Sequence, residues 1–149
     1  MAGVDFRMEG GRTLEEALAQ FTKPMAKGVG RRALKKAAAP ILDDYQANTK
    51  VVSGNLQESE VAGTRLNPRQ RKLNKKDPSK SAIEIHIGTA DPGGIQEEFG
   101  NANQAAHPAL RPAWDKEGGQ AAVDRIADEL AKDIEKTAAR VARRAARGG

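Results

Sequence analysis

Few residues of this chain have the types and spacing that catalysis or metal binding requires. His86 lies on the polar face of an alternating stretch and His107 precedes a proline, and neither has a partner at metal-ligand spacing. Glu97 and Glu98 are adjacent, so on a helical turn their side chains diverge and do not form a general acid/base pair. We therefore expect ordinary surface or loop histidines, no bound metal or cofactor, and no enzymatic activity.

Two glycine-rich pieces and the absence of cysteine narrow the chemistry further. Residues 28–30 (GVG) and 93–94 (GG) lack the strand-to-helix context and the lysine that a phosphate cradle requires. The lack of cysteine removes disulfides, thiolate metal sites and cysteine nucleophiles together. The sequence therefore indicates a protein that acts by binding.

A basic segment at residues 65–80, RLNPRQRKLNKKDPSK, is the strongest chemical feature. Its two prolines and its lack of apolar periodicity predict a flexible loop. The loop either contacts phosphates or an acidic rim on a partner, or is a solvated segment that keeps the protein soluble. It contains no aromatic residue, so any contact with nucleic acid would be electrostatic and independent of sequence. The candidate contact residues are Arg65, Arg69, Arg71, Lys72, Lys75, Lys76 and Lys80.

The composition predicts one basic domain covering residues 1–149. Aromatic residues make up only 3% of the chain, which leaves a core of Ile, Leu, Val and Ala. We expect such a protein to be weakly stable alone and completed by neighbouring copies. The net charge of +5 suits nucleic acid or an acidic protein surface.

No apolar run approaches the ~20 residues of a membrane span, and the first residues, MAGVDFRMEGG, have no signal-peptide core. We therefore expect no membrane partner and a protein that is assembled in the cytoplasm of its host cell.

The N-terminal third predicts a short strand and a pair of helices. Apolar residues alternate at 4, 6 and 8, which is typical of a strand, and a capping-box pattern opens a helix at about 13–22. Pro24 can open a second helix, in which Pro40 predicts a kink or a break. Its apolar residues recur every four positions, namely Val29, Ala33, Ala37, Ile41 and Tyr45. Its basic residues fall largely on other faces, which are typical of a solvated surface. The functional alternative is that this basic helix lies along nucleic acid.

The middle of the chain predicts an antiparallel hairpin. Residues 56–66 favour a strand with Val61 pointing inward, and Ile83, Ile85 and Ile87 alternate with polar residues in a second strand. The basic segment would then be the tip that joins the two strands.

Residues 91–115 form a long connector that composition does not explain as ordinary helix or strand. Asp91 can cap a short helix, Pro92 suits its first position, and Gly100 can end it in a left-handed conformation. Two prolines, Pro108 and Pro112, then fix the backbone before a long helix. A connector of this length usually binds something or docks on a neighbour.

The C-terminal third predicts one long amphipathic helix from about Ala113 to Arg147. Gly118 and Gly119 weaken its beginning, so Gln120 is an alternative start. From residue 138 to 149 it becomes a basic end, which suits the negative pole of the helix dipole. Together the elements predict an α+β fold, in which a small, mainly antiparallel sheet carries the kinked N-terminal helix pair and the long C-terminal helix packed on it.

Two short elements carry a family resemblance. EFG at 98–100, followed by HPALRPA at 107–113, resembles the "EFG, then P-hydrophobic-LRPA" signature of the neck or tail-completion proteins, which join head to tail in long-tailed bacteriophages. SGNL at 53–56 is similar to the "S/T-G-x-L" element of that family, and order and spacing match from about 11 to 137. Asn101 and Ala109 depart from the pattern, which usually has threonine and phenylalanine there.

The resemblance implies a non-enzymatic virion protein that forms a ring, sixfold like phage tails, at the head–tail junction. Its partners would be further copies, head-closure or connector proteins, and the tail terminator and tail tube proteins, with genomic DNA touching the basic loop in the lumen. The tail terminator itself and a basic protein that binds nucleic acid non-specifically stay open as alternatives.

Phe99 and Leu110 are expected to plug the edge of the core, and the residues between them to face outward. The interface or loop-anchor candidates are Glu98, Phe99, Gly100, Pro108, Leu110, Arg111 and Pro112.

Overall fold

The computed structural model describes residues 16–50, 54–74 and 83–148. Residues 16–19 are helical, within the first predicted helix. The strand predicted at residues 4–8 lies outside the described residues. The later elements, in chain order, are α2 (Lys23–Asn48), α3 (Asn55–Ser59), β1 (Glu60–Gly63), α4 (Pro68–Leu73), β2 (His86–Thr89), α5 (Gly93–Phe99), α6 (Leu110–Glu117) and α7 (Gln120–Arg147).

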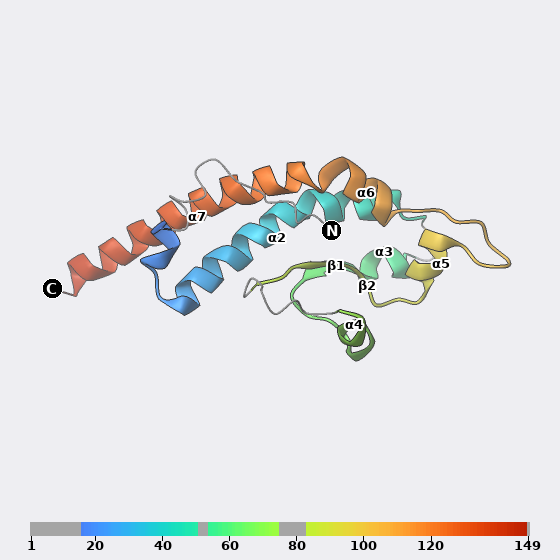
Figure 1. Cartoon of the computed structure of the whole chain (residues 1–149), viewed down its shortest axis with the longest axis horizontal. Coiled ribbons are helices and arrows are strands. Elements are labelled where there is room, and N and C mark those ends of the chain that lie inside the picture. The colour runs from blue at the N-terminus through green and yellow to red at the C-terminus, as the bar shows by residue number, and fades with distance from the viewer. Residues whose placement is uncertain (1–15, 51–53, 75–82, 149) are drawn as a thin grey trace, which may run out of the picture.

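The fold is α+β, as predicted, with long helices above a small antiparallel sheet (Figure 1). Strands β1 and β2 pair from Glu60 opposite Thr89 to Gly63 opposite His86. The basic segment connects them, so the predicted antiparallel hairpin is confirmed.

Helix α2 is the central helix of the fold, with contacts to α6, α7 and β1. Its buried residues include all five of the apolar positions predicted from their spacing. Small side chains among them allow close packing of the helices on this face. The predicted break at Pro40 does not occur, because α2 continues to Asn48. A proline removes one backbone hydrogen bond, a cost that burial of residues on both sides of it offsets.

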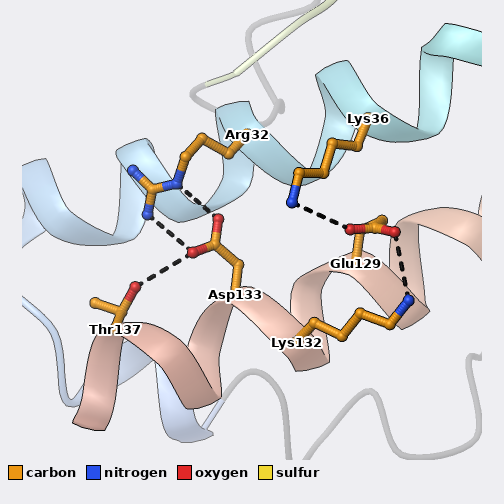
Figure 2. A network of polar contacts seen from close by, with 6 residues as sticks. All are labelled: Arg32, Lys36, Glu129, Lys132, Asp133 and Thr137. Carbon is orange, nitrogen blue, oxygen red and sulfur yellow. Dashed lines mark hydrogen bonds and ion pairs between the residues drawn. The ribbon is translucent and has the colours of Figure 1, made fainter. Parts of the chain in front are cut away.

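Helix α7 lies antiparallel to α2, as the contacts between them show. Arg32 binds Asp133 (Nε to Oδ2, 2.7 Å), and four residues later Lys36 meets Glu129 (Nζ to Oε2, 3.6 Å) (Figure 2). Rising numbers on α2 thus match falling numbers on α7. We expected the C-terminal helix on the sheet, but it packs chiefly along α2, and α2 is the long helix with the main contact to β1.

The C-terminal helix is divided in two at Gly118 and Gly119. Gly119 has a φ of +58°, a backbone conformation that L side chains rarely adopt, and Gly118 lies against Trp114. The longer helix therefore starts at Gln120, the alternative that the glycines indicated. The preceding helix α6 packs on the end of α2, where Ala109 and Ala113 join Ile41 and Tyr45 in the core.

The strand predicted over residues 56–66 is largely wrong. Residues 55–59 form α3, which follows Gly54 at a φ of +84°, and the strand covers only 60–63. Val61 was expected to point inward but is 58% exposed, whereas Glu60 is 2% exposed. Side chains alternate between the two faces of a strand, so a frame shifted by one residue exchanges its inside and outside.

The basic segment is not wholly a loop. Pro68 opens α4, and Asn67 and Gln70 form a reciprocal capping box before it, with the Gln70 N–H donating to Asn67 Oδ1 at 2.8 Å. The capping box and Pro68 thus start a helix here although the segment has no apolar stripe. β2 begins at His86, so Ile83 and Ile85 precede the strand that they were predicted to open. Among the described residues, no helix is long and apolar enough to cross a membrane.

Candidate interface site

The short helix α5 begins one residue later than the sequence predicts, at Gly93, so Pro92 holds the cap position that was expected for Asp91 and offers no side-chain cap. Asp91 Oδ1 accepts a hydrogen bond from the Gly93 N–H at 2.8 Å, and the Asp91 N–H donates to Thr89 Oγ1 at 3.0 Å. These bonds tie the helix to the end of β2. Gly94 is packed so closely that an added Cβ would lie 2.3 Å from Thr89 Cγ2. The first turn of α5 is therefore fixed on the sheet.

Gly100 ends α5 and cannot be replaced without strain. Its φ is +74°, as predicted for a glycine at this place. An added Cβ would also meet backbone, at 2.7 Å from the Ala106 nitrogen and 2.9 Å from the Gln104 carbonyl oxygen. Gly100 thus lets the chain turn back on itself between the two elements that carry the family resemblance.

Glu98 joins these two elements directly. Its carboxylate accepts hydrogen bonds from the backbone N–H groups of Ala109 (2.9 Å), Leu110 (3.0 Å) and Arg111 (2.9 Å). These are N–H groups at the start of α6, which have no partner inside the helix. Glu98 therefore caps α6 from outside it, because Ala109, the residue at the cap position, has no side chain that could do so.

The environment of Glu98 favours its ionised form. Burial raises the pKa of this carboxyl, but the three backbone N–H donors and the nearby Arg111 guanidinium together hold the pKa below its usual value. The charge also lies at the positive end of the α6 dipole. The cap is accordingly charged at neutral pH.

The segment between Gly100 and Ala109 is held at its ends and exposed in between. The Asn101 N–H donates to the Gln104 carbonyl oxygen at 2.8 Å, and the His107 N–H donates to the Glu97 carbonyl oxygen at 2.7 Å. All residues from 101 to 108 are exposed. The outward presentation of this stretch is therefore as expected.

An open, mostly apolar hollow of about 530 Å³ lies beside this loop. We call it the aromatic hollow. Three large exposed hydrophobic side chains line it, Ile95 (59% exposed), Phe99 (67%) and Trp114 (52%). Tyr45 lines it from α2, so three of the five aromatic residues of the chain surround one cavity. Exposed apolar patches of this kind mark contact surfaces.

Tyr45, which lines the hollow, and Glu60 on β1 are both buried. Burial and the carboxylates of Glu60 and Glu98 raise the pKa of Tyr45 to about 12. Burial also raises the pKa of Glu60, against the hydrogen bond that Thr49 Oγ1 donates to its Oε1 and with the repulsion from Glu97. The other carboxylate oxygen of Glu60 is buried without a hydrogen-bond partner among the described residues.

The predicted anchor residues divide into two groups. Leu110 packs against the core as expected, whereas Phe99 is exposed and does not plug the core edge. The tight return at Gly100 turns Phe99 toward the hollow, and buried Ala109 takes the place in the core. The structure brings Glu98 and Gly100 to the start of α6. It leaves Pro108, Arg111 and Pro112 exposed on the surface of the molecule.

The predicted contact residues of the basic segment are exposed where the structure describes them. Helix α4 carries three of them, and Arg65 precedes it. Gln70 Nε2 donates to the Thr89 carbonyl oxygen at 3.1 Å, which holds α4 at the end of β2. Lys75, Lys76 and Lys80 lie outside the described residues.

The aromatic hollow was not predicted from the sequence. Tyr45 was assigned to a helix stripe, and nothing in its spacing brings it to Phe99 and Trp114. The capping role of Glu98 was also not predicted, because it accepts hydrogen bonds from N–H groups 11 to 13 residues later, beyond the reach of any local cap pattern. The only sequence signal for these two features is the group of apolar residues beside Pro108 and Pro112.

Metal-ligating side chains do not gather in the described ranges. His86 Nε2 lies 3.6 Å from Glu84 Oε2, a single surface contact. No group of three or more His, Asp or Glu residues in this part of the chain could hold a metal ion. Comparisons with protein-family models, with curated proteins and with solved structures give no significant match to this chain.

Proposed function

We propose that this chain is a structural protein of a tailed-phage virion, which forms a ring at the head–tail junction and connects the head connector to the tail. The observation that carries the proposal is the bonding of Glu98, in the EFG element, to the backbone of 109–111, in the LRPA element. The two elements that resemble the neck and tail-completion family thus form one unit. That unit holds an exposed loop beside an aromatic hollow, which is how a contact surface is built.

The mechanism of such a protein is assembly. Neighbouring copies would bind through exposed loops and helix ends, and adjoining rings would bind above and below. Completion by neighbours also suits a chain whose core uses many alanines and whose largest side chains are partly outside it. The partners would be further copies, connector or head-closure proteins, and tail terminator and tube proteins.

Localisation in virions tests the proposal. Antibodies against the purified chain, with gold labels, would be applied to phage particles induced from the strain that carries the gene. We expect label at the junction of head and tail. Label at the far end of the tail, or particles without label, would contradict the proposal, and label on head-free tails at their upper end would favour the tail terminator instead.

A second candidate is non-specific binding of nucleic acid, which the exposed cations of α4 favour. It predicts that the isolated protein binds duplex DNA and that the affinity falls steeply with salt, as counterion release requires. Fluorescence anisotropy with a labelled duplex at several salt concentrations measures both. No binding at moderate salt would rule this candidate out.

A further inference from the structure

The fold separates charge along the long axis of the molecule. Residues 23–36 of α2 carry six Lys or Arg residues and no acid, whereas residues 37–48 carry only Asp43 and Asp44. Residues 136–147 of α7 carry Lys136 and four arginines, again with no acid. Since α2 and α7 are antiparallel, both basic stretches lie at the same end (Figure 1).

Among the residues that the structure describes, only the inner part of this basic end is neutralised by acids of the chain. Arg32 and Lys36 bind acids of α7, and the contact with Arg32 lowers the pKa of Asp133 (Figure 2). In the described part of the chain no ion pair involves the outer cations, which are exposed on the two helices: Lys23, Lys27, Arg31, Arg140, Arg143 and Arg144.

The last three turns of α7 have no packing partner among the described residues. Thr137 is 2% exposed, but every residue from 138 to 148 is exposed. This part offers one face of small apolar residues, with Val141 (41% exposed) between Ala138 and Ala145. A helix of this length is marginal by itself in water, so a surface that receives it would stabilise it.

The opposite end of the molecule has the complementary character. It holds the aromatic hollow, which Tyr45 lines from the last turn of α2, about 33 Å along the helix from Lys23 at 1.5 Å per residue. In the sequence Asp91 lies just before α5 and Asp115 just after Trp114, so two carboxylates neighbour the lining residues. Helix α6 carries two exposed cations, Arg111, which lines the hollow, and Lys116, which pairs with Asp44. Aromatic side chains surrounded by charge form typical centres of protein interfaces.

We propose that the basic end of α7 of one copy docks head-to-tail into the aromatic hollow of the next copy. Val141 and its neighbouring alanines cover the apolar lining, and the arginines meet Asp91 and Asp115. The two surfaces lie at opposite ends, so the contact is heterologous and repeats from copy to copy, which closes into a ring when the rotation permits. This deepens the proposed ring and rests on that function for its biological setting.

Charge favours a second copy over nucleic acid as the occupant. A phosphate backbone would match the arginines but leave the small apolar face of α7 and the hollow of the same molecule without partners. A second copy covers both surfaces at once and pairs opposite charges. Direct binding of duplex DNA by the basic end is accordingly an outcome that the experiment must distinguish.

Two variants, each altered at one end, test the contact in the full chain. The first changes Arg140, Arg143, Arg144 and Arg147 to Glu, and the second combines Phe99→Ser with Asp115→Asn, all at exposed positions. Sedimentation equilibrium at low ionic strength measures assembly. We expect wild-type oligomers and, for each variant alone, a dissociation constant raised at least about tenfold.

Mixing the two variants gives the sharpest result. Each keeps one intact end, so a head-to-tail contact predicts one-to-one dimers that grow no further. The matched control reverses four cations on or before α4, namely Arg65, Arg69, Arg71 and Lys72, and removes the same charge without changing assembly. Melting temperatures of all variants confirm that they fold.

Three outcomes would overturn the inference. They are a wild-type chain that stays monomeric at the highest attainable concentration, end variants that assemble like wild type, and a mixture that forms no dimer. A monomer whose binding to duplex DNA is lost with the four arginines would assign the basic end to phosphate instead. Virion labelling is read separately, so a ring built through other surfaces remains distinguishable from a wrong function.

Discussion

At the scale of single residues, Glu98 determines how the candidate interface is held. One carboxylate accepts three backbone N–H groups and so fixes the start of α6 relative to the end of α5. Bonds of this kind are charge-assisted and stronger than bonds between neutral groups. The neighbouring residue Phe99 can therefore be exposed without loosening the loop, because the loop is anchored by polar bonds and by Ala109.

Removing the cap should be costly. We expect Glu98→Ala to lower the free energy of unfolding by about 2 kcal/mol at pH 7, the upper range for a helix cap. Urea unfolding of both proteins measures it. Because the folded pKa of Glu98 lies below its unfolded value, its contribution is present above the unfolded pKa and is lost as pH falls through the folded pKa. The difference between the proteins should therefore shrink in acid, and a constant difference would contradict the charged cap.

Glu60 should behave in the opposite way. Its folded pKa is raised by burial, so its contribution to stability is fully present below its unfolded pKa and is lost as pH rises through the folded pKa. Glu60→Gln keeps an acceptor for Thr49 and removes the buried charge. We expect a higher melting temperature at pH 7 and a smaller gain at pH 4, measured by circular dichroism. Equal gains at both pH values would show that Glu60 is not charged when folded.

At the scale of elements, glycines set where the short helices begin and end. Gly54 and Gly100 both have positive φ, but an added Cβ meets nothing within 4 Å at Gly54 and meets backbone at Gly100. Local conformation explains the first position, and the close return of the loop explains the second. A pair of matched substitutions separates these two effects.

We expect Gly54→Ala to cost about 1 kcal/mol, the strain of positive φ alone. Gly100→Ala should cost clearly more, about 3 kcal/mol, because backbone atoms must also move. Thermal unfolding of the two variants under one condition gives the comparison. Equal costs would mean that the loop between residues 100 and 106 adapts freely to a side chain.

At the scale of the whole molecule, the antiparallel helix pair creates two unlike ends. One end carries exposed cations and the exposed end of α7, and the other carries the aromatic hollow. The packed part of the pair, which ends at Thr137, supplies the stability of the isolated chain. The part beyond it is therefore available for assembly.

Two truncations should separate stability from assembly. Ending the chain after Ala139 removes only exposed residues, so we expect a melting temperature within about 2 °C of the full chain. Ending it after Lys132 also removes Asp133, Ile134 and Thr137 and should destabilise the protein by about 3 kcal/mol. Calorimetry measures both. A large loss of stability in the chain that ends after Ala139 would place residues 140–149 in the folded core.

Local patterns of the sequence were enough to predict the stripe of α2, the paired strands, the end of α5 at Gly100 and the break before Gln120. Each depends on neighbours in the chain: apolar spacing or a glycine. The frame of β1 was predicted wrongly because its buried face is set by contact with α2 and by the Thr49 bond to Glu60, which lie outside the strand. Pattern alone favoured Val61 inside.

The sequence by itself determined the helical spacing, the charge of each stretch and the absence of cysteine chemistry. The tertiary structure alone decided which stretches meet. Antiparallel packing of α2 and α7 gathers cations that lie about a hundred residues apart, and the return of the chain at Gly100 brings Tyr45, Phe99 and Trp114 around one hollow. The physical reason is that such contacts depend on long-range burial, whereas caps and turns depend on bonds within a few residues.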